Sequence, residues 1–258
     1  MKKIIILAGN GELPYYVATE LEKRNIDFFI ITFKNNKVSA KLKKYNPIEI
    51  NFGKIITELK KLKIKKFDSI IMIGGLKKPK LFQIKPDINS IKLIPIFTKK
   101  ILEGGDNNLL SFCLEKIEDI GYKIINIKDI LPKLFLGKGV FTKLSPKKDM
   151  IKDIKKGQKI LKEISKFDIG QSIIIQKGNV VGIEGDQGTD ILIKNSKNYL
   201  VNDTNAILIK STKHKQDLRV DLPTIGIKTM ENCKKSNIYG LAFCANYTIF
   251  LDVKKIIS

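Results

Sequence analysis

Histidine, arginine and tryptophan are almost missing from this chain of 258 residues. It contains one histidine (His214), two arginines (Arg24 and Arg219) and no tryptophan. A Ser-His-Asp triad or a histidine-rich metal site is hard to build around a single histidine. A bound metal would therefore have to rely mainly on oxygen ligands, which favours Mg²⁺ or Mn²⁺.

Cysteine and long apolar runs are also scarce. The three cysteines are scattered and form no C-x-x-C, which excludes a disulfide framework and argues against a zinc site. No stretch of 18 apolar residues could span a membrane. The apolar start at residues 4–8 is too short for a secretory signal. We therefore expect a cytoplasmic protein.

Positive charge is what the chain has in excess, with a formal net charge of +22. Lysines supply 46 of the 48 basic residues and are spread along the whole sequence. A base-reading protein is expected to use arginine, so we predict no nucleic-acid partner. A diffuse positive surface could still attract anionic lipid headgroups. Among so many lysines, Arg219 is a candidate for a position that needs guanidinium geometry.

The order of the apolar segments predicts an α/β fold. In the first half, strands are expected at 3–8, 27–32, 69–73 and 122–127, and helices at 14–24, 54–63 and 108–120. Strands that alternate with helices indicate a parallel sheet with right-handed crossovers. We predict a Rossmann-like domain over residues 1–131 and a linker rich in proline and glycine over 132–146.

The second half predicts a mixed α/β domain over residues 147–258. Its expected elements are an amphipathic helix at 147–165, a hairpin of 172–176 with 180–184, a strand at 207–210, a helix at 227–235, and strands at 238–243 and 247–253 with Asn246 at the turn between them.

Three segments of the first half are candidates for phosphate binding. They lie at strand ends or helix starts, the edge where open α/β sheets bind ligands. Ordinary turns, or an N-cap at Asp106, explain them as well. Pro14 replaces the third glycine of a dinucleotide fingerprint and no acid ends the second strand, so NAD binding is disfavoured. The candidate residues are Gly9, Asn10, Gly11, Gly74, Gly75, Lys77 and Asp106.

Two acidic segments stand out in the second half. The loop 184–190 holds three acids and two glycines, and could bind a metal or sugar hydroxyls, or cap the next helix. In 213–226, Asp217, Arg219 and Asp221 alternate, so an extended chain would place them on one face. Two carboxylates could then share Mg²⁺ while the arginine clamps a phosphate. A surface salt-bridge ladder is an equal alternative.

Taken together, these segments resemble the UDP-2,3-diacylglucosamine pyrophosphatase family of the lipid A pathway, the type unrelated to metallophosphatases. The resemblance covers nearly the whole chain, and its most specific part is the string Gln-Asp-x-Arg-x-Asp-x-Pro-Thr-Ile-Gly at 216–226. Residues 171–176, 184–190 and 239–242 also match strongly. Two departures are Asp186-Gln187 before Gly188 and Gly105 at a position where a second acid is common.

The resemblance implies an activity, a cofactor and site residues, and a cytoplasmic enzyme that could lie on the inner face of the inner membrane. The reaction would be Mg²⁺-dependent hydrolysis of UDP-2,3-diacylglucosamine to UMP and 2,3-diacylglucosamine 1-phosphate. The substrate would lie between the two domains of the chain, and the protein would be a homodimer. The essential aspartate would be Asp221, with Asp217 as the substitute; both are candidate metal ligands, and Arg219 would stabilise phosphoryl charge. Direct attack by water is expected. Further substrate contacts would be Gln171, Glu184, Gly188, Thr189, Asp190 and Thr224.

Two rival functions remain on the sequence alone. One is a nucleotide-sugar transferase or oxidoreductase built on the Rossmann-like half. The other is a non-catalytic basic module that binds RNA or membrane, which predicts binding that weakens steeply with salt.

Overall fold

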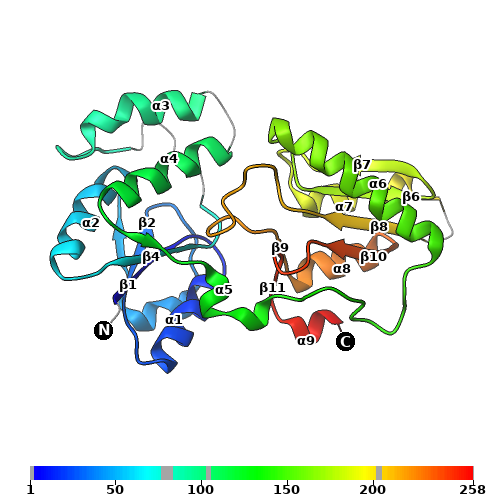
Figure 1. The fold of residues 1–258 in the computed structure, drawn as a ribbon, viewed down its shortest axis with the longest axis horizontal. Coiled ribbons are helices and arrows are strands. Elements are labelled where there is room, and N and C mark those ends of the chain that lie inside the picture. The colour runs from blue at the N-terminus through cyan, green and yellow to red at the C-terminus, as the bar shows by residue number, and fades with distance from the viewer. Residues whose placement is uncertain (1–2, 77–83, 103–105, 202–204, 258) are drawn as a thin grey trace. The chain divides into compact units, whose positions relative to one another are not determined.

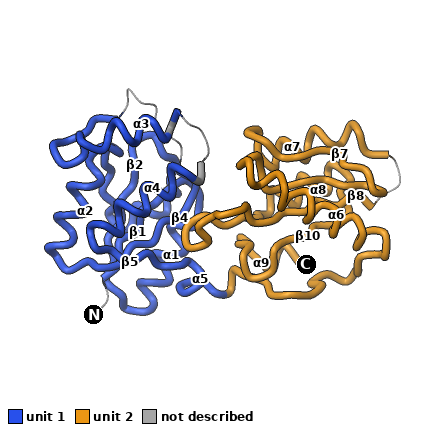
Figure 2. The backbone as a smooth tube through the Cα atoms, turned by 45° about the horizontal axis from the view of Figure 1, so that its top comes forward, with its two compact units in different colours: residues 1–132 blue, residues 133–258 orange. Residues whose placement is uncertain are grey.

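The computed structural model describes residues 3–76, 84–102, 106–201 and 205–257. The chain forms two compact units, residues 1–132 and 133–258 (Figure 2). Most of the predicted linker 132–146 belongs to the second unit. Residues Pro132–Leu134 form a 3₁₀ turn, and Phe135 makes a bridge to Ile249.

Unit 1 is built on a five-stranded parallel sheet with the order β3-β2-β1-β4-β5 (Figure 1). This is the strand order of the Rossmann fold, so the predicted α/β class is confirmed. Its strands are β1 (Lys3–Ala8), β2 (Asp27–Phe33), β3 (Ile48–Ile50), β4 (Ser69–Ile73) and β5 (Lys123–Ile124). Its α-helices are α1 (Leu13–Lys23), α2 (Ile55–Ile64), α3 (Ile94–Leu102), α4 (Asp106–Asp119) and α5 (Ile127–Ile130).

The apolar runs explain why β1 and β4 lie at the centre of this sheet. Residues 4–8 of β1 and all of β4 are buried, as expected for parallel strands covered on both faces. Helix α1 begins with Pro14 in its first turn, where a missing N–H costs nothing. Its buried stripe of Val17, Ala18 and Leu21 has helical spacing.

Unit 2 has a four-stranded mixed sheet with the order β10-β8-β6-β7 and a two-stranded sheet of β9 and β11. Its strands are β6 (Ser172–Gln176), β7 (Asn179–Ile183), β8 (Ala206–Lys210), β9 (Thr224–Ile225), β10 (Ile238–Phe243) and β11 (Ile249–Phe250). Its α-helices are α6 (Lys148–Ile164), α7 (Thr189–Ser196), α8 (Ile227–Lys235) and α9 (Val253–Ile257). The prediction of a mixed α/β fold for the second half of the chain is thus also confirmed.

Strands β6 and β8 are buried on both faces because their apolar side chains alternate between two cores. One core joins Ile173, Ile175, Ile207 and Ile209 to α6. The opposite core joins Ile174, Ala206 and Leu208 to α7 and α8. The period of two residues assigns alternate positions to each face. The hairpin of β6 and β7 turns at Lys177 and Gly178, both at positive φ, as a two-residue hairpin turn requires.

Two strand predictions were wrong in part. The expected strand 122–127 is reduced to β5, because Asn126 accepts a hydrogen bond from the N–H of Lys128 and caps α5 instead. The expected strand 247–253 is reduced to β11, which pairs with β9 rather than with β10. Asn246, at positive φ, donates its N–H to the carbonyl of Leu136, and this turns the chain away from β10.

Candidate active site

In unit 1, the two glycine turns after β1 and β4 pack against each other. The N–H of Asn10 donates to the carbonyl of Gly75 at 2.8 Å, and the N–H of Gly75 returns to Asn10 at 3.2 Å. A Cβ on Gly9 would lie 2.6 Å from the carbonyl oxygen of Gly74, and Gly74 itself has φ +91°. The close packing of the two turns is enough to require glycine at these positions, whether or not a phosphate binds there. At Gly11 an added Cβ would meet nothing within 4 Å, but the backbone φ of +94° favours glycine there as well.

The remaining predicted positions of unit 1 are described only in part. Lys77 lies outside the described residues. Asp106 is the first residue of α4, so this helix begins two residues before the expected start at Asn108.

In unit 2, one edge of the four-stranded sheet gathers a buried polar cluster. Lys210 ends β8 opposite Ser172, the first residue of β6, and Glu184 follows β7 with its N–H on the carbonyl of Ser172 at 2.9 Å. The hydroxyl of Thr189 joins them: Lys210 Nζ donates to Thr189 Oγ1 at 2.6 Å, and Thr189 Oγ1 donates to Glu184 Oε1 at 2.8 Å. Lys210 is only 5% exposed. The cluster therefore holds a charged amine and a carboxylate away from bulk water.

The pKa values of this cluster reflect burial and mutual attraction. Burial lowers the pKa of Lys210, while the charges of Glu184 and Asp190 act in the opposite direction. Burial would raise the pKa of Glu184, but the charge of Lys210 and hydrogen bonds from Ser172, Thr189 and the backbone outweigh it and lower this pKa. Glu184 is thereby held as the anion.

The other predicted residues of this edge surround the start of α7. Gly188 is the residue before α7, at φ +78°, and Asp190 accepts a hydrogen bond from Thr229 of α8 at 3.4 Å. Gln171 donates its N–H to Glu184 Oε2 at 3.3 Å. Within the described part of the chain, the buried Gln171 Oε1 has no hydrogen-bond partner, so a bound ligand could satisfy it.

The segment with alternating acids is a turn, which corrects the expected extended strand. The N–H groups of Val220 and Asp221 both donate to the carbonyl of Asp217, at 3.1 and 3.0 Å. Pro223 then leads into β9, where Thr224 Oγ1 donates to the carbonyl of Leu222 at 3.2 Å. The side chain of Asp217 accepts from the N–H of Arg219, and this local bond favours a turn over an extended chain. Residues four apart on a helical turn still lie on one side of it.

Asp217 and Arg219 form a forked ion pair. Arg219 Nε donates to Asp217 Oδ1 at 3.0 Å, and Nη2 donates to Oδ2 at 2.7 Å. The hydrogen bonds from Arg219 lower the pKa of Asp217 against the opposing effect of partial burial. Both oxygens of Asp217 are therefore engaged, and this holds the half-exposed guanidinium in a fixed orientation.

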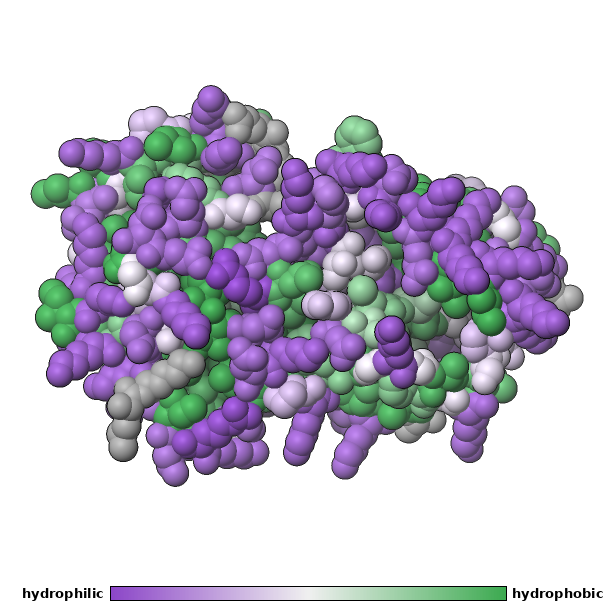
Figure 3. Space-filling model, viewed as in Figure 1, coloured by the Kyte–Doolittle hydropathy of each residue, from purple (hydrophilic) through white to green (hydrophobic). Residues whose placement is uncertain are grey.

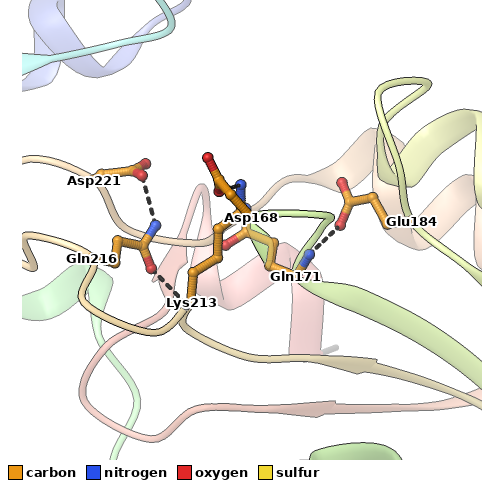
Figure 4. A network of polar contacts seen from close by, with 6 residues as sticks. All are labelled: Asp168, Gln171, Glu184, Lys213, Gln216 and Asp221. Carbon is orange, nitrogen blue, oxygen red and sulfur yellow. Dashed lines mark hydrogen bonds and ion pairs between the residues drawn. The ribbon is translucent and has the colours of Figure 1, made fainter. Parts of the chain in front are cut away.

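The side chain of Asp221 takes part in a second set of contacts, drawn in Figure 4. Gln216 Nε2 donates to Asp221 Oδ2 at 2.7 Å, and Gln216 Oε1 accepts from the N–H of Lys213 at 2.9 Å. Lys213 Nζ in turn pairs with Asp168 Oδ1 at 2.7 Å. The carboxylate of Asp221 is thus supported by a network that reaches back to the segment before β6.

The carboxylates of the turn 217–221 could bind a cation only if other oxygen atoms complete its coordination shell. Across the described residues, no three His, Cys, Asp or Glu side chains gather to hold a metal. Mg²⁺ is commonly bound by one or two carboxylates together with substrate phosphates. Asp221 fits that role, whereas in this arrangement Asp217 is committed to Arg219 on both oxygens.

Sequence reasoning missed the partners that lie behind the predicted residues. Lys210 was placed in a strand without a role, and Lys213, Gln216 and Asp168 were not candidates. The one available signal for Lys210 was a charged residue at the end of the otherwise apolar strand Ala206–Lys210. Lys213 and Asp168 meet across 45 positions, which composition and spacing do not show. The contacts of Gln216 with Lys213 and Asp221 are local, but they depend on the conformation of the turn, which the sequence pattern did not indicate.

Fold and site together define a class: a two-unit α/β protein with a Rossmann-type sheet in one unit and a cluster of carboxylates, lysines and one arginine at a mixed sheet in the other. The LpxI N-terminal domain matches residues 3–134 and the LpxI C-terminal domain matches residues 137–258. The chain therefore belongs to the LpxI family, which confirms the family resemblance.

A full-length relative agrees with this assignment. The UDP-2,3-diacylglucosamine pyrophosphatase LpxI of Caulobacter vibrioides is 25% identical over 264 residues, covering 100% of this chain and 94% of that protein.

Proposed function

We propose that this chain hydrolyses the diphosphate of UDP-2,3-diacylglucosamine, a lipid-bearing nucleotide sugar, within lipid A biosynthesis. The observation that carries the proposal is the match of both LpxI domains along almost the whole chain. The full-length relative, whose name states this activity, supports it. Water would add to one phosphorus and the bridging P–O bond would break, releasing UMP and 2,3-diacylglucosamine 1-phosphate.

The residues of the turn 217–221 would act on the diphosphate. Asp221 would hold Mg²⁺ together with phosphate oxygens, and the bound ion would supply neutralisation of the diphosphate charge. Arg219, oriented by Asp217, would donate hydrogen bonds to phosphoryl oxygens as their charge increases. We therefore give Asp217 the role of orienting Arg219 and assign metal binding to Asp221.

The sheet-edge cluster of unit 2 would bind other polar parts of the substrate. The buried acceptor Gln171 Oε1 needs a donor, and a sugar hydroxyl would supply one. Gly188 precedes α7, and Thr189 and Asp190 begin it, so the free N–H groups of this helix start could bind an anionic part of the substrate. In unit 1, the turn at Gly9, Asn10 and Gly11 remains our proposal for a nucleotide contact.

The direct test is release of UMP from UDP-2,3-diacylglucosamine, with and without Mg²⁺. The Asp221→Asn variant should lose roughly 10²–10³-fold in turnover, as removal of one such electrostatic group typically does. Asp149→Asn is a matched control, because its carboxylate is 86% exposed on α6 and pairs there with Lys152. A wild-type protein that releases no UMP, or an Asp221→Asn variant with normal turnover, would contradict the proposal.

We also propose a membrane surface and a second copy of the chain as partners. No described helix is long and apolar enough to cross a bilayer. The support for surface contact is a set of exposed apolar side chains in α3 and the residues just before it: Ile88, Ile91, Ile96 and Leu102. The exposed Lys92 and Lys99 lie near them in the sequence.

The proposed homodimer rests on the family resemblance, and sedimentation at several protein concentrations would test it.

A further inference from the structure

We propose that Gln216, with the ion pair of Lys213 and Asp168 behind it, is a positioning residue for the Asp221 carboxylate. The inference rests on the proposed function, because it takes Asp221 to be the metal ligand. It adds three residues to the machinery, none of which touches the reacting atoms.

Gln216 is placed to fix one orientation of Asp221. Its side chain is buried, with the residue only 8% exposed, and both ends of its amide are engaged. Nε2 donates to Asp221 Oδ2 at 2.7 Å, while Oε1 accepts from the N–H of Lys213 at 2.9 Å (Figure 4). A backbone donor holds the amide from behind, so the amide can turn only by giving up a buried hydrogen bond.

The ion pair anchors the same segment to the sheet. Lys213 Nζ lies 2.7 Å from Asp168 Oδ1, and their side chains are 15% and 20% exposed. The next contact along this segment is the N–H of Ser211 on the carbonyl of Gln171, at 2.9 Å. The chain that carries Asp221 is thus attached twice to the residues just before β6. Because the pair is mostly screened from water, it can act as a fixed anchor.

A support of this kind has a consequence that differs from simple stability. A carboxylate on a short turn has several rotamers, and a hydrogen bond to one oxygen selects the rotamer that meets the metal. Loss of such a partner typically weakens metal affinity about 10–100-fold. A merely structural role would lower thermal stability and leave metal affinity unchanged.

The test compares Gln216→Leu, which removes both amide contacts, with Asp168→Asn, which breaks the ion pair. Binding of Mn²⁺ is measured by electron paramagnetic resonance of the free ion, alone and with UMP, beside the Mg²⁺ dependence of UMP release. We expect Gln216→Leu to weaken Mn²⁺ binding about 10–100-fold and to raise the Mg²⁺ requirement in proportion. Asp168→Asn should have a smaller effect in the same direction and add little in the double variant, because both act through one network.

Glu163→Gln is the matched control, since Glu163 also pairs with a lysine, Lys166 at 2.6 Å, on the exposed end of α6. It should leave Mn²⁺ binding unchanged. Wild-type Mn²⁺ affinity in a folded Gln216→Leu protein, with a lower melting temperature alone, would overturn the positioning role only. Absence of Mg²⁺-dependent UMP release from the wild-type protein would overturn the proposed function, and this inference with it.

Discussion

Arg219 carries a geometry that lysine cannot reproduce. It is one of two arginines beside 46 lysines, and its Nε and Nη2 reach the two oxygens of Asp217 together. Arg219→Lys keeps the charge but loses the fork. We expect UMP release to fall roughly 10²-fold, near the lower end for loss of an electrostatic donor, with unchanged folding. Steady-state kinetics and circular dichroism would measure both, and normal turnover would show that charge alone is enough.

Glu184 and Lys210 should depend on each other for stability. Removing one partner of a buried ion pair leaves an uncompensated charge and costs about 3–5 kcal/mol. We expect this range for Glu184→Gln and for Lys210→Met in urea unfolding. The double variant should cost clearly less than the sum of the two. Additive costs would show that the charges do not interact through Thr189 and the surrounding cluster.

The pH dependence of Glu184→Gln follows from the direction of the pKa shift. The folded state lowers the pKa of Glu184 below its ordinary value of 4.5. The ionised group therefore contributes stability above that pH, and this contribution is lost as pH falls through the lower, folded-state value. The difference in unfolding free energy between wild type and variant should be full at pH 7 and shrink on acidification below 4.5. A difference that stays constant would contradict the assignment.

At the scale of elements, the exits of β1 and β4 are joined by a glycine contact. A Cβ on Gly9 would lie 2.6 Å from the backbone oxygen of Gly74, whereas on Gly75 the nearest atom would be 4.0 Å away. Gly9→Ala should therefore destabilise unit 1 by roughly 1–3 kcal/mol through overpacking. Gly75→Ala, two residues after β4, is the matched control and should stay within about 0.5 kcal/mol. Thermal unfolding of both variants would measure this difference. Equal stabilities of the two variants would show that the contact between Gly9 and Gly74 does not require glycine.

Elements were predicted well where a strong local pattern agrees with the tertiary structure. The apolar runs 3–8 and 69–73 became β1 and β4, and residues 227–235 became α8. The strand expected at 247–253 was shortened at its start because Asn246 bonds to Leu136, and at its end because Asp252, at positive φ, leads into α9. The turn at 217–221 was missed because alternation of charge says nothing about the side chain of Asp217 bonding to its own backbone.

In the candidate site, too, the sequence indicated the local segments but not the contacts between distant residues. Sequence singled out 184–190 and 213–226, since their residue types carry chemistry. It could not find that Lys210 meets Thr189, or that Lys213 meets Asp168 across 45 positions. Such pairs depend on strand register, which a single sequence does not reveal.

For the whole molecule, the positive charge spread over the surface and the exposed apolar side chains near α3 should act together in binding to lipid. Figure 3 shows hydrophilic side chains over much of the visible face, with smaller hydrophobic areas among them. A net charge of +22 favours anionic vesicles, and this attraction weakens as salt screens it. We expect binding to vesicles of mixed neutral and anionic lipid, and less binding to neutral vesicles or at high salt.

The exposed apolar side chains in and just before α3 should carry the part of vesicle binding that salt does not remove. Ile88 and Leu102 are 89% and 73% exposed, so replacing both with aspartate should leave folding intact. Complete burial of one such side chain contributes roughly 1.5–3 kcal/mol, so the double variant should bind vesicles at least about tenfold more weakly in a sedimentation assay. Ile64→Asp is the control, because Ile64 is 85% exposed at the end of α2. Equal losses in both proteins would mean that added negative charge, rather than the side chains near α3, determines binding.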